Sequence, residues 1–313
     1  MGDIFDVTAG EDFSRARTRE TFSRVVNALR PQNQELLSLS EVRRYLRPQK
    51  ETYRGVHPVP VDRIIGSEGR YRDFNKGFLP KREALRGRWT SIDKAHLRDV
   101  ILPPIRLYEI GGVYFVRDGN HRVSVARAQG VLTIDAEITV LDSEIAIDPR
   151  MTSRELKRRV IDYEKQKFYA TTDFAEWTGG YDLNFTETGR YDEVLKHIHG
   201  HKYFLDQKRE SELSLDEAAR SWFVNVFKPI VDTIRREGII SRFPGRTVDD
   251  LYVWIVKHWH FLKERTSDEY PAEAAARDFS NRFGASPLRR FLRRIGIRRL
   301  PKEGTDDPGQ MPV

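Results

Sequence analysis

The chain contains no cysteine among its 313 residues. That absence excludes disulfides, a catalytic thiol, an iron–sulfur cluster and any zinc site built from thiolates. Long apolar runs are also missing, because no stretch approaches the roughly 18 residues that a membrane span requires. The opening residues Met1–Ile4 lack the basic and then apolar order of a secretory signal. We therefore expect a soluble, cytoplasmic protein with no transmembrane segment.

Positive charge is in modest excess. The net charge is +7 and the pI about 9.5, with 32% charged and 39% hydrophobic residues. Such a balance favours polyanionic partners such as nucleotides or nucleic acid. The length is more consistent with two domains than with one. Basic residues gather near both ends, at Arg15, Arg17, Arg19, Arg24 and Arg30 and at Arg289, Arg290, Arg293, Arg294, Arg298, Arg299 and Lys302.

The first 50 residues are expected to form a helical lead-in. Residues 11–47 predict a helical pair, since Phe22, Val25 and Val26 recur at helical spacing. We expect this lead-in to pack on the domain that follows it.

Residues 51–148 predict a small α/β domain. A first strand over Val59–Ile65 is followed by Gly66–Asn75, which is rich in turn formers and is expected to be a loop. Gly111-Gly112 between two apolar runs predicts a β-hairpin. A helix from Asn120 should end at Gly130, and alternating residues at 134–139 predict a last strand.

Residues 149–285 predict an all-α domain, so the expected fold class is α+β. Helix signals begin at Ser153–Phe168. Ser214 with Glu217 forms a capping-box pattern, and Pro229 should kink or split the helix that follows. Thr247 and Asp250 cap the next helix in a similar way, and its apolar stripe is typical of core packing.

Residues 286–313 predict a basic amphipathic segment followed by a disordered tail. The arginines at 289, 290, 293 and 294 alternate with apolar residues after Pro287. Such a segment could bind nucleic-acid phosphates or an anionic membrane surface. The pattern is equally consistent with a solvated tail that binds neither.

The stretch Tyr114–Arg127 is the most informative part of the sequence, because it predicts a buried strand that passes through a glycine into a helix. The first N–H groups of a helix have no partner within it, and the helix dipole places partial positive charge there. Asn120, His121 and Arg122 add side-chain donors at the same point. The pattern predicts an anion site suited to phosphate.

These residues resemble the nucleotide-binding box of the ParB/sulfiredoxin superfamily. Gly119-Asn120-His121-Arg122 occupies the place of the Gly-Glu-Arg-Arg box of its partitioning proteins. The sequence is nearer still to the Asp-Gly-His-His-Arg form of the kinase-like members. Val59–Ile65 resembles the family's first strand, and Leu102–Tyr108 resembles the strand entering its hairpin. The resemblance spans about residues 56–141. It implies a ParB/sulfiredoxin-like domain that binds ATP, ADP or CTP, with Mg²⁺ as an accompanying ion. The absence of cysteine excludes the sulfiredoxin reaction.

The resemblance also implies roles for single residues. Gly119 lets the backbone approach the ligand, Asn120 and His121 donate to phosphate oxygens, and Arg122 offers a bidentate fork. An acidic residue after the first strand suggests Glu68 as a catalytic base. The further expected members of the site are Asp118 or Glu68 as a Mg²⁺ ligand, and Ser67, Arg70 and Arg72 as phosphate contacts.

Three functions follow from this expected site. The first is a nucleotide-dependent regulatory or DNA-associated protein, although residues 150–265 show no helix-turn-helix pattern. The second is a phosphotransferase or nucleotide hydrolase that uses Glu68. The third is a nucleotide-sensing scaffold without chemistry. A homodimer is a further expectation.

Five histidines of the second domain, at 197, 199, 201, 258 and 260, raise the question of a metal site. Their i, i+2 spacing does not place them on one helix face, and no His-Glu-x-x-His pattern occurs. We expect capping or buried hydrogen bonding, and leave the identity of any metal ligand open.

Overall fold

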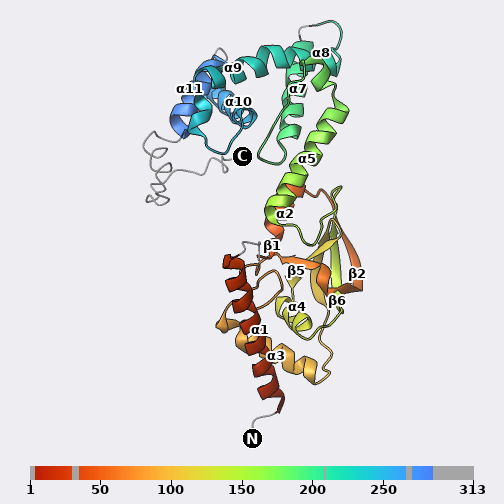
Figure 1. Cartoon of the computed structure of the whole chain (residues 1–313). Helices are drawn as coiled ribbons and strands as arrows, with labels where there is room; N and C mark the ends of the chain where they lie inside the picture. The colour runs from red at the N-terminus through yellow and green to blue at the C-terminus, as the bar shows by residue number, and fades with distance from the viewer. Residues whose placement is uncertain (1–3, 30–34, 208, 266–269, 285–313) are drawn as a thin grey trace. The chain divides into compact units, whose positions relative to one another are not determined.

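The computed structural model describes residues 4–29, 35–207, 209–265 and 270–284. They divide into two compact units, residues 1–160 and 161–313, and the division falls inside helix α5 (Ser153–Thr171). The first unit combines a sheet with helices, and the described part of the second is helical (Figure 1). The predicted α+β class, a small α/β domain followed by a helical region, is confirmed.

The first unit is built on a six-stranded mixed sheet with the order β1-β3-β5-β4-β6-β2. Its strands are β1 (Leu37–Ser38), β2 (Glu51–Pro60), β3 (Ile64–Ser67), β4 (Ile105–Ile110), β5 (Val113–Asp118) and β6 (Thr133–Leu141). β3 and β5 are parallel neighbours, with Ser67 in register with Val116. Their carboxyl ends therefore meet at one edge of the sheet, where ligands of α/β sheets commonly bind.

The predicted hairpin and last strand are confirmed. β4 and β5 pair antiparallel, and Gly111 and Gly112 both have positive φ (59° and 82°). The helix predicted from Asn120 is α4 (Asn120–Ala128), and Gly130 follows it with φ 73°. These features depend on local turn chemistry, which the sequence displays directly.

The predicted first strand is wrong in its extent. β2 ends at Pro60, a 3₁₀ turn η1 (Val61–Arg63) intervenes, and β3 begins at Ile64. Proline lacks an N–H and is confined to edge strands, so Pro58 and Pro60 suit the sheet edge where β2 pairs only with β6.

The loop predicted from Gly66 starts later, since Gly66 and Ser67 belong to β3. A Cβ on Gly66 would lie 2.4 Å from the Phe115 ring and 2.5 Å from the Leu37 carbonyl oxygen. This glycine is therefore required by close strand packing and does not mark a turn.

In the first unit, helix α3 (Arg86–Leu97) packs against both α1 (Ile4–Leu29) and α4 (Figure 1). The 3₁₀ turn η2 (Glu83–Leu85) precedes α3. Phe13 of α1 meets Trp89 of α3 edge to face, with ring centroids 5.6 Å apart. The Trp89 indole N–H donates to the Ser124 hydroxyl of α4 (2.8 Å), which donates to the Phe78 carbonyl (2.6 Å). Side-chain contacts thus join the three helices into one layer.

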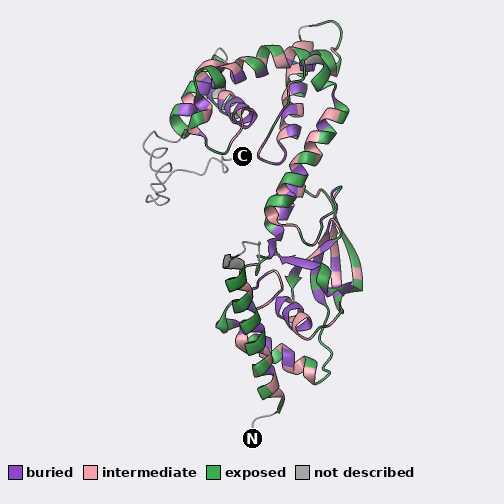
Figure 2. Cartoon of the chain, viewed as in Figure 1, coloured by how far each residue is buried: buried purple, intermediate pink, exposed green. Residues whose placement is uncertain are grey.

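The predicted helical pair is present as α1 and the shorter α2 (Leu39–Leu46), with β1 before α2. The lead-in packs on the domain that follows it, as expected, but not through the residues that indicated the helix, because Phe22, Val25 and Val26 are 70%, 55% and 44% exposed. The buried stripe carries Ala9, Phe13, Ala16 and Glu20 and appears as the buried side of α1 in Figure 2. Small residues let α1 approach α3 closely, so the buried face of the helix is not the one that carries most of its large apolar residues.

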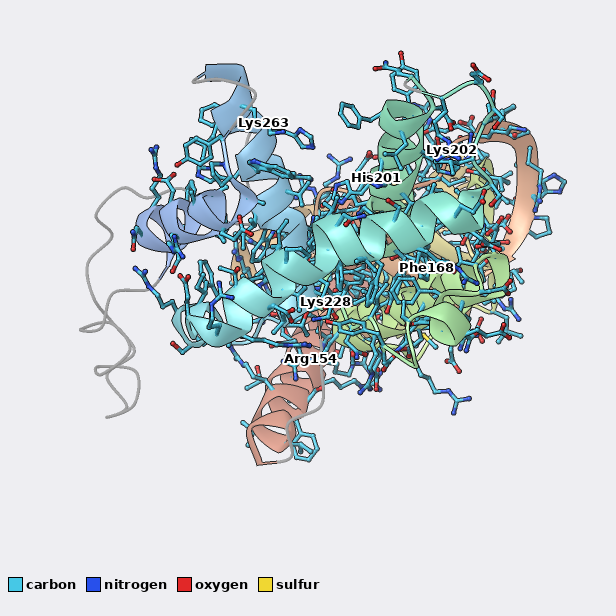
Figure 3. All side chains as sticks on the ribbon, turned by 90° about the horizontal axis from the view of Figure 1, so that it is seen from above. Arg154, Phe168, His201, Lys202, Lys228 and Lys263 are labelled. Atoms are coloured by element: carbon cyan, nitrogen blue, oxygen red, sulfur yellow. The ribbon has the colours of Figure 1, made fainter. Side chains whose placement is uncertain are left out.

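The second unit contains α6 (Phe174–Trp177), α7 (Arg190–Asp206), α8 (Leu215–Trp222), α9 (Lys228–Arg236), the 3₁₀ turn η4 (Ile239–Arg242), α10 (Val248–Arg265) and α11 (Ala272–Phe283). Its core is rich in aromatic rings, among them Phe168, Trp222, Phe227 and Tyr252. Lysines of the outer faces, such as Lys202 and Lys228 in Figure 3, pair with Asp206 and Asp232.

Both predicted capping boxes are confirmed. Ser214 accepts from the Glu217 N–H, and the Glu217 carboxylate accepts from the Ser214 N–H (2.9 Å). Thr247 and Asp250 exchange the same pair of bonds at 3.1 and 3.0 Å. The predicted split at Pro229 takes the form of a π-helical turn, η3 (Phe223–Phe227), which joins α8 to α9 and leaves proline in the first turn of α9.

No helix among the described residues is long and apolar enough to cross a membrane. The predicted basic segment, with Arg289, Arg290, Arg293 and Arg294, lies outside the described residues.

Candidate functional site

The candidate site lies at the junction between β5 and α4, and Gly119 makes this junction possible. Gly119 has φ 106°, and a Cβ there would lie 2.4 Å from Cγ2 of Ile105. Every other residue would meet both backbone strain and a steric clash. The chain can therefore turn from the sheet into α4 directly beside β4 only with glycine at this point.

The first turn of α4 presents three backbone amides without partners inside the helix. The first intrahelical bond runs from the Val123 N–H to the Gly119 carbonyl (3.0 Å), so the amides of Asn120, His121 and Arg122 precede the ladder. The glycine before them has no side chain to cap them. Together with the helix dipole, these amides form an anion-binding point.

Two buried side chains at the same turn have polar atoms without partners. Asn120 and His121 are only 7% and 6% exposed, yet Asn120 Oδ1 and His121 Nδ1 have no hydrogen-bond partner. An unsatisfied buried polar atom costs about 1–3 kcal/mol. A group that supplies these bonds would recover that cost, because half a turn of the carboxamide or a change of imidazole tautomer offers either a donor or an acceptor.

His121 is neutral near pH 7. Burial is the main cause that lowers its pKa to about 4, and the nearby positive charges of Arg70 and Arg88 lower it further. Its ring stands edge to face against Phe74, with centroids 5.4 Å apart. Positive potential therefore already exists at this position without a charge on the imidazole.

Arg122 and Asp118 are engaged with each other and with the neighbouring chain. Arg122 donates to the carbonyls of Pro103 and Pro104 and to Asp118 Oδ2 (2.8 Å). Its side chain is only 14% exposed. The guanidinium thus links α4 to the segment before β4. Because these bonds use several of its N–H groups, fewer remain for a ligand than the bidentate role predicted from the sequence would need.

Arg70 and Arg88 complete a small cleft over the first turn of α4. The cleft has a volume of about 140 Å³ and is lined by Arg70, Arg88, Ile92, Asp118, Gly119, Asn120, His121 and Arg122. Arg70 contacts Asp73 at 3.2 Å, whereas Arg88 makes no ion pair with a described residue. Arg88 was missed by sequence reasoning, because it projects from α3, about thirty residues before the box, and no local motif marks it.

Ser67, Glu68 and Arg72, the remaining predicted residues, are not among the residues that line the cleft. The buried Ser67 hydroxyl donates to the Val116 carbonyl (3.3 Å) and accepts from the Arg70 N–H (3.2 Å), so it shapes the turn that carries Arg70. Glu68 is exposed directly after β3, and its N–H donates to Val116 (2.9 Å). Arg72 lies near the Tyr71 ring. Their proposed roles stay predictions.

Hydrogen bonding, which we expected of the second unit's histidines, occurs at three of them. His197 contacts the Tyr252 hydroxyl (3.2 Å), His201 the Ser221 hydroxyl (2.9 Å) and His258 the Asp278 carboxylate (2.7 Å). Across the described ranges, no group of three or more histidine or acidic side chains is placed to hold a metal ion.

Comparisons with known proteins add little to this geometry. No protein-family model matches the chain, and no curated protein matches it significantly. Among solved structures, the chain is similar to one described as a Pnob8-like ParB-N domain, with 10% identity over 78% of this chain and 94% of that chain. The TM-score of 0.22 is too low for this likeness to support any argument about fold family or function.

Proposed function

We propose that the first unit binds a phosphate-bearing ligand, a nucleotide, at the cleft over the first turn of α4. The observation that carries the proposal is the convergence on one small cleft of the first turn of α4, whose amides precede the helix ladder, and the cations of Arg70 and Arg88. Backbone amides and a guanidinium are the donors that phosphate oxygens prefer.

The cleft suits the phosphates and leaves the nucleoside outside. Its volume of about 140 Å³ is below the roughly 300–1,000 Å³ typical of sites that enclose a whole small molecule. Its lining contains cations and polar groups and no aromatic ring besides the His121 imidazole. We therefore assign Arg70 and Arg88 to the phosphate oxygens, and the base to the surface beyond the cleft.

Binding, and with it a nucleotide-dependent regulatory role, has more support than turnover. The one carboxylate among the lining residues, Asp118, is paired with Arg122, and Glu68 does not line the cleft. A general base must lie within hydrogen-bond reach of the proton that it removes. Catalysis by Glu68, a Mg²⁺ ion held by Asp118 or Glu68, and DNA association through the C-terminal arginines remain predictions.

Calorimetric titration with ATP, ADP, CTP, GTP and pyrophosphate, with and without Mg²⁺, tests the proposal. We expect saturable binding that Arg88→Ala weakens by about tenfold or more, since a charge-assisted contact is worth about 1.5–3 kcal/mol. Arg54→Ala is the matched control, because it also removes one arginine of the same unit, paired with Glu109 on β4. Equal loss in both variants would mean that only net charge matters. Absence of binding to all five ligands would overturn the proposal.

A further inference from the structure

Helix α1 is apolar on two opposite faces. At 100° per residue, the buried stripe of Ala9, Phe13, Ala16 and Glu20 is centred on one side of the helix. Roughly opposite to it lie five large apolar residues that are all exposed: Ile4 (72%), Val7 (58%), Phe22 (70%), Val25 (55%) and Val26 (44%). A helix with a single buried side needs only one apolar stripe, so the second stripe indicates a second packing partner.

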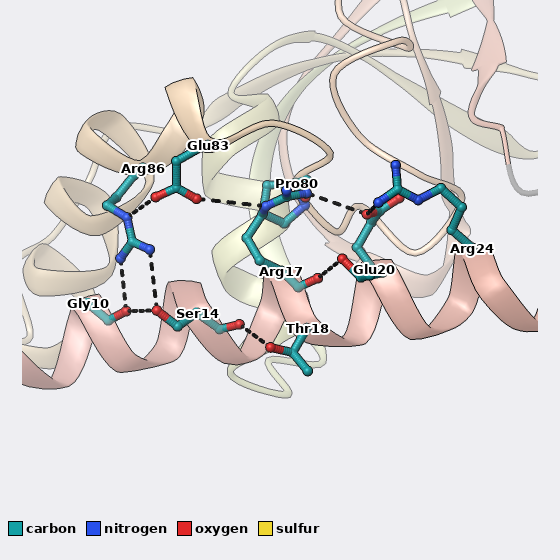
Figure 4. A network of polar contacts seen from close by, with 10 residues as sticks. Gly10, Ser14, Arg17, Thr18, Glu20, Arg24, Pro80, Glu83 and Arg86 are labelled. Carbon is teal, nitrogen blue, oxygen red and sulfur yellow. Dashed lines mark hydrogen bonds and ion pairs between the residues drawn. The ribbon is translucent and has the colours of Figure 1, made fainter.

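The hydrogen bonds of α1 with the rest of its unit come from residues outside the second stripe, although Ser14 borders it, about 20° around the helix from Val7 and Val25. Arg86, the first residue of α3, donates to the Gly10 carbonyl (3.2 Å) and the Ser14 hydroxyl (3.3 Å), and Arg17 donates to the Pro80 carbonyl (3.1 Å) (Figure 4). The exposure of the second stripe shows that no described segment covers it.

Apart from Val26, whose mirror position is Asp3, the second stripe has the same order of apolar and polar residues in both directions along the helix. Its middle is polar, with Glu11 and Thr18, and both of its ends are apolar. Around a midpoint between residues 14 and 15, Ile4 is as far from the centre as Val25, and Val7 as far as Phe22. Glu11 and Thr18 are likewise equidistant. These six positions fall within an arc of roughly 60°.

We propose that this face of α1 binds the same face of a second copy of the chain, with the two helices antiparallel. A two-fold interface is self-complementary, since each residue of one copy meets, in the other copy, the residue at its mirror position. In this register Ile4 and Val7 of one copy meet Val25 and Phe22 of the other, and polar middle meets polar middle. No register shift of a full turn or more pairs all four apolar positions.

The charged residues beside the second stripe also favour a second copy of the chain as its partner. Glu11 of one copy comes within about one helical turn of Arg15 of the other, on the same side of the seam, so the two charges across the interface are opposite. Both side chains are exposed in the single chain, and Arg15 is 63% exposed beside Asp12. The pairing occurs twice by symmetry.

Sedimentation velocity over a wide range of protein concentration measures the dimer. We expect a reversible monomer–dimer equilibrium that Phe22→Asp shifts to monomer. Leu132→Asp is the control, since it places the same charge on another exposed apolar residue (84%, against 70% for Phe22) outside α1. Because Phe22 is exposed, folding should be unchanged by circular dichroism. A monomer at every concentration, or a dimer that persists in Phe22→Asp, would overturn the proposal.

Cysteine cross-linking tests the antiparallel register independently, in a chain that has no cysteine of its own. Glu11→Cys mixed with Thr18→Cys should form disulfide-linked heterodimers, because the two positions face each other. Either variant alone should not, because each residue is about 10 Å along the axis from its own mate, beyond the roughly 7 Å limit between Cα atoms. Self-linking of each single variant would indicate parallel helices and contradict the proposal, as would no linking in the mixture.

Discussion

At the scale of single residues, Gly119 decides whether the cleft exists. Its φ of 106° and the approach of Ile105 allow β5 to pass into α4 without a capping side chain, so the amides of Asn120 to Arg122 stay free. The sequence predicted this strand–glycine–helix junction correctly, because a glycine between an apolar strand and a helix is a local signal. The neighbours of Gly119 across the sheet are set by strand pairing, which the sequence does not display.

Gly119→Ala should destabilise the first unit by about 3 kcal/mol, from the backbone penalty plus the clash with Ile105. Gly112→Ala is the matched control, because Gly112 has φ 82° and open space where a Cβ would be, so only the backbone penalty of about 1 kcal/mol applies. Denaturant unfolding of both variants measures the difference. Equal costs would show that the close approach to Ile105 is unimportant.

His121 should make stability depend on pH. Its pKa is about 4 in the folded chain against about 6.5 when unfolded, so protonation favours unfolding. Its contribution is complete above pH 6.5 and is lost as the pH falls toward 4, by at most about 2 kcal/mol at pH 5. Comparing denaturant unfolding of the wild type and His121→Gln at pH 7 and pH 5 isolates this residue. An identical pH response in the two proteins would contradict a buried neutral imidazole.

At the scale of elements, the position of α3 is what sequence reasoning could not supply. The hairpin, the α4 junction and both capping boxes were predictable, because their determinants lie within a few residues of each other. α3 shows no clear apolar period, since its two buried residues are Trp89 and the charged Asp93, which accepts a hydrogen bond from Gln129. Arg88 enters the site only through this packing.

Ser124→Ala should cost about 2–4 kcal/mol, because it leaves the buried Trp89 N–H and Phe78 carbonyl without partners. Ser143→Ala is the control, as its half-buried hydroxyl bonds only within a local turn with Ile145 and should cost less than about 1 kcal/mol. Denaturant unfolding gives both values. A small effect of Ser124→Ala would indicate that water replaces the hydroxyl and that α3 is held otherwise.

At the scale of the whole molecule, every residue of the proposed cleft belongs to the first unit. The second unit has its own aromatic core and internal hydrogen bonds. If the two units unfold separately, the ligand should stabilise the first without the second, since binding to a native state stabilises the cooperative unit that carries the site.

Hydrogen exchange with and without nucleotide should show protection confined to the first unit, strongest over residues 118–123 and the segments that carry Arg70 and Arg88. Exchange in residues 161–265 should be unchanged. Protection of comparable size in the second unit would mean that the ligand acts on both units and that the cleft is only part of its site.

The most direct test of the account is amide NMR of the first turn of α4 during titration with nucleotide. We predict large, saturable shifts of the N–H signals of Asn120, His121 and Arg122, with a shift of the His121 ring nitrogens, and their loss in Arg88→Ala. Shifts confined to other surfaces, or none at saturating nucleotide, would contradict a phosphate site at this helix and leave Gly119 and its neighbours as a structural joint.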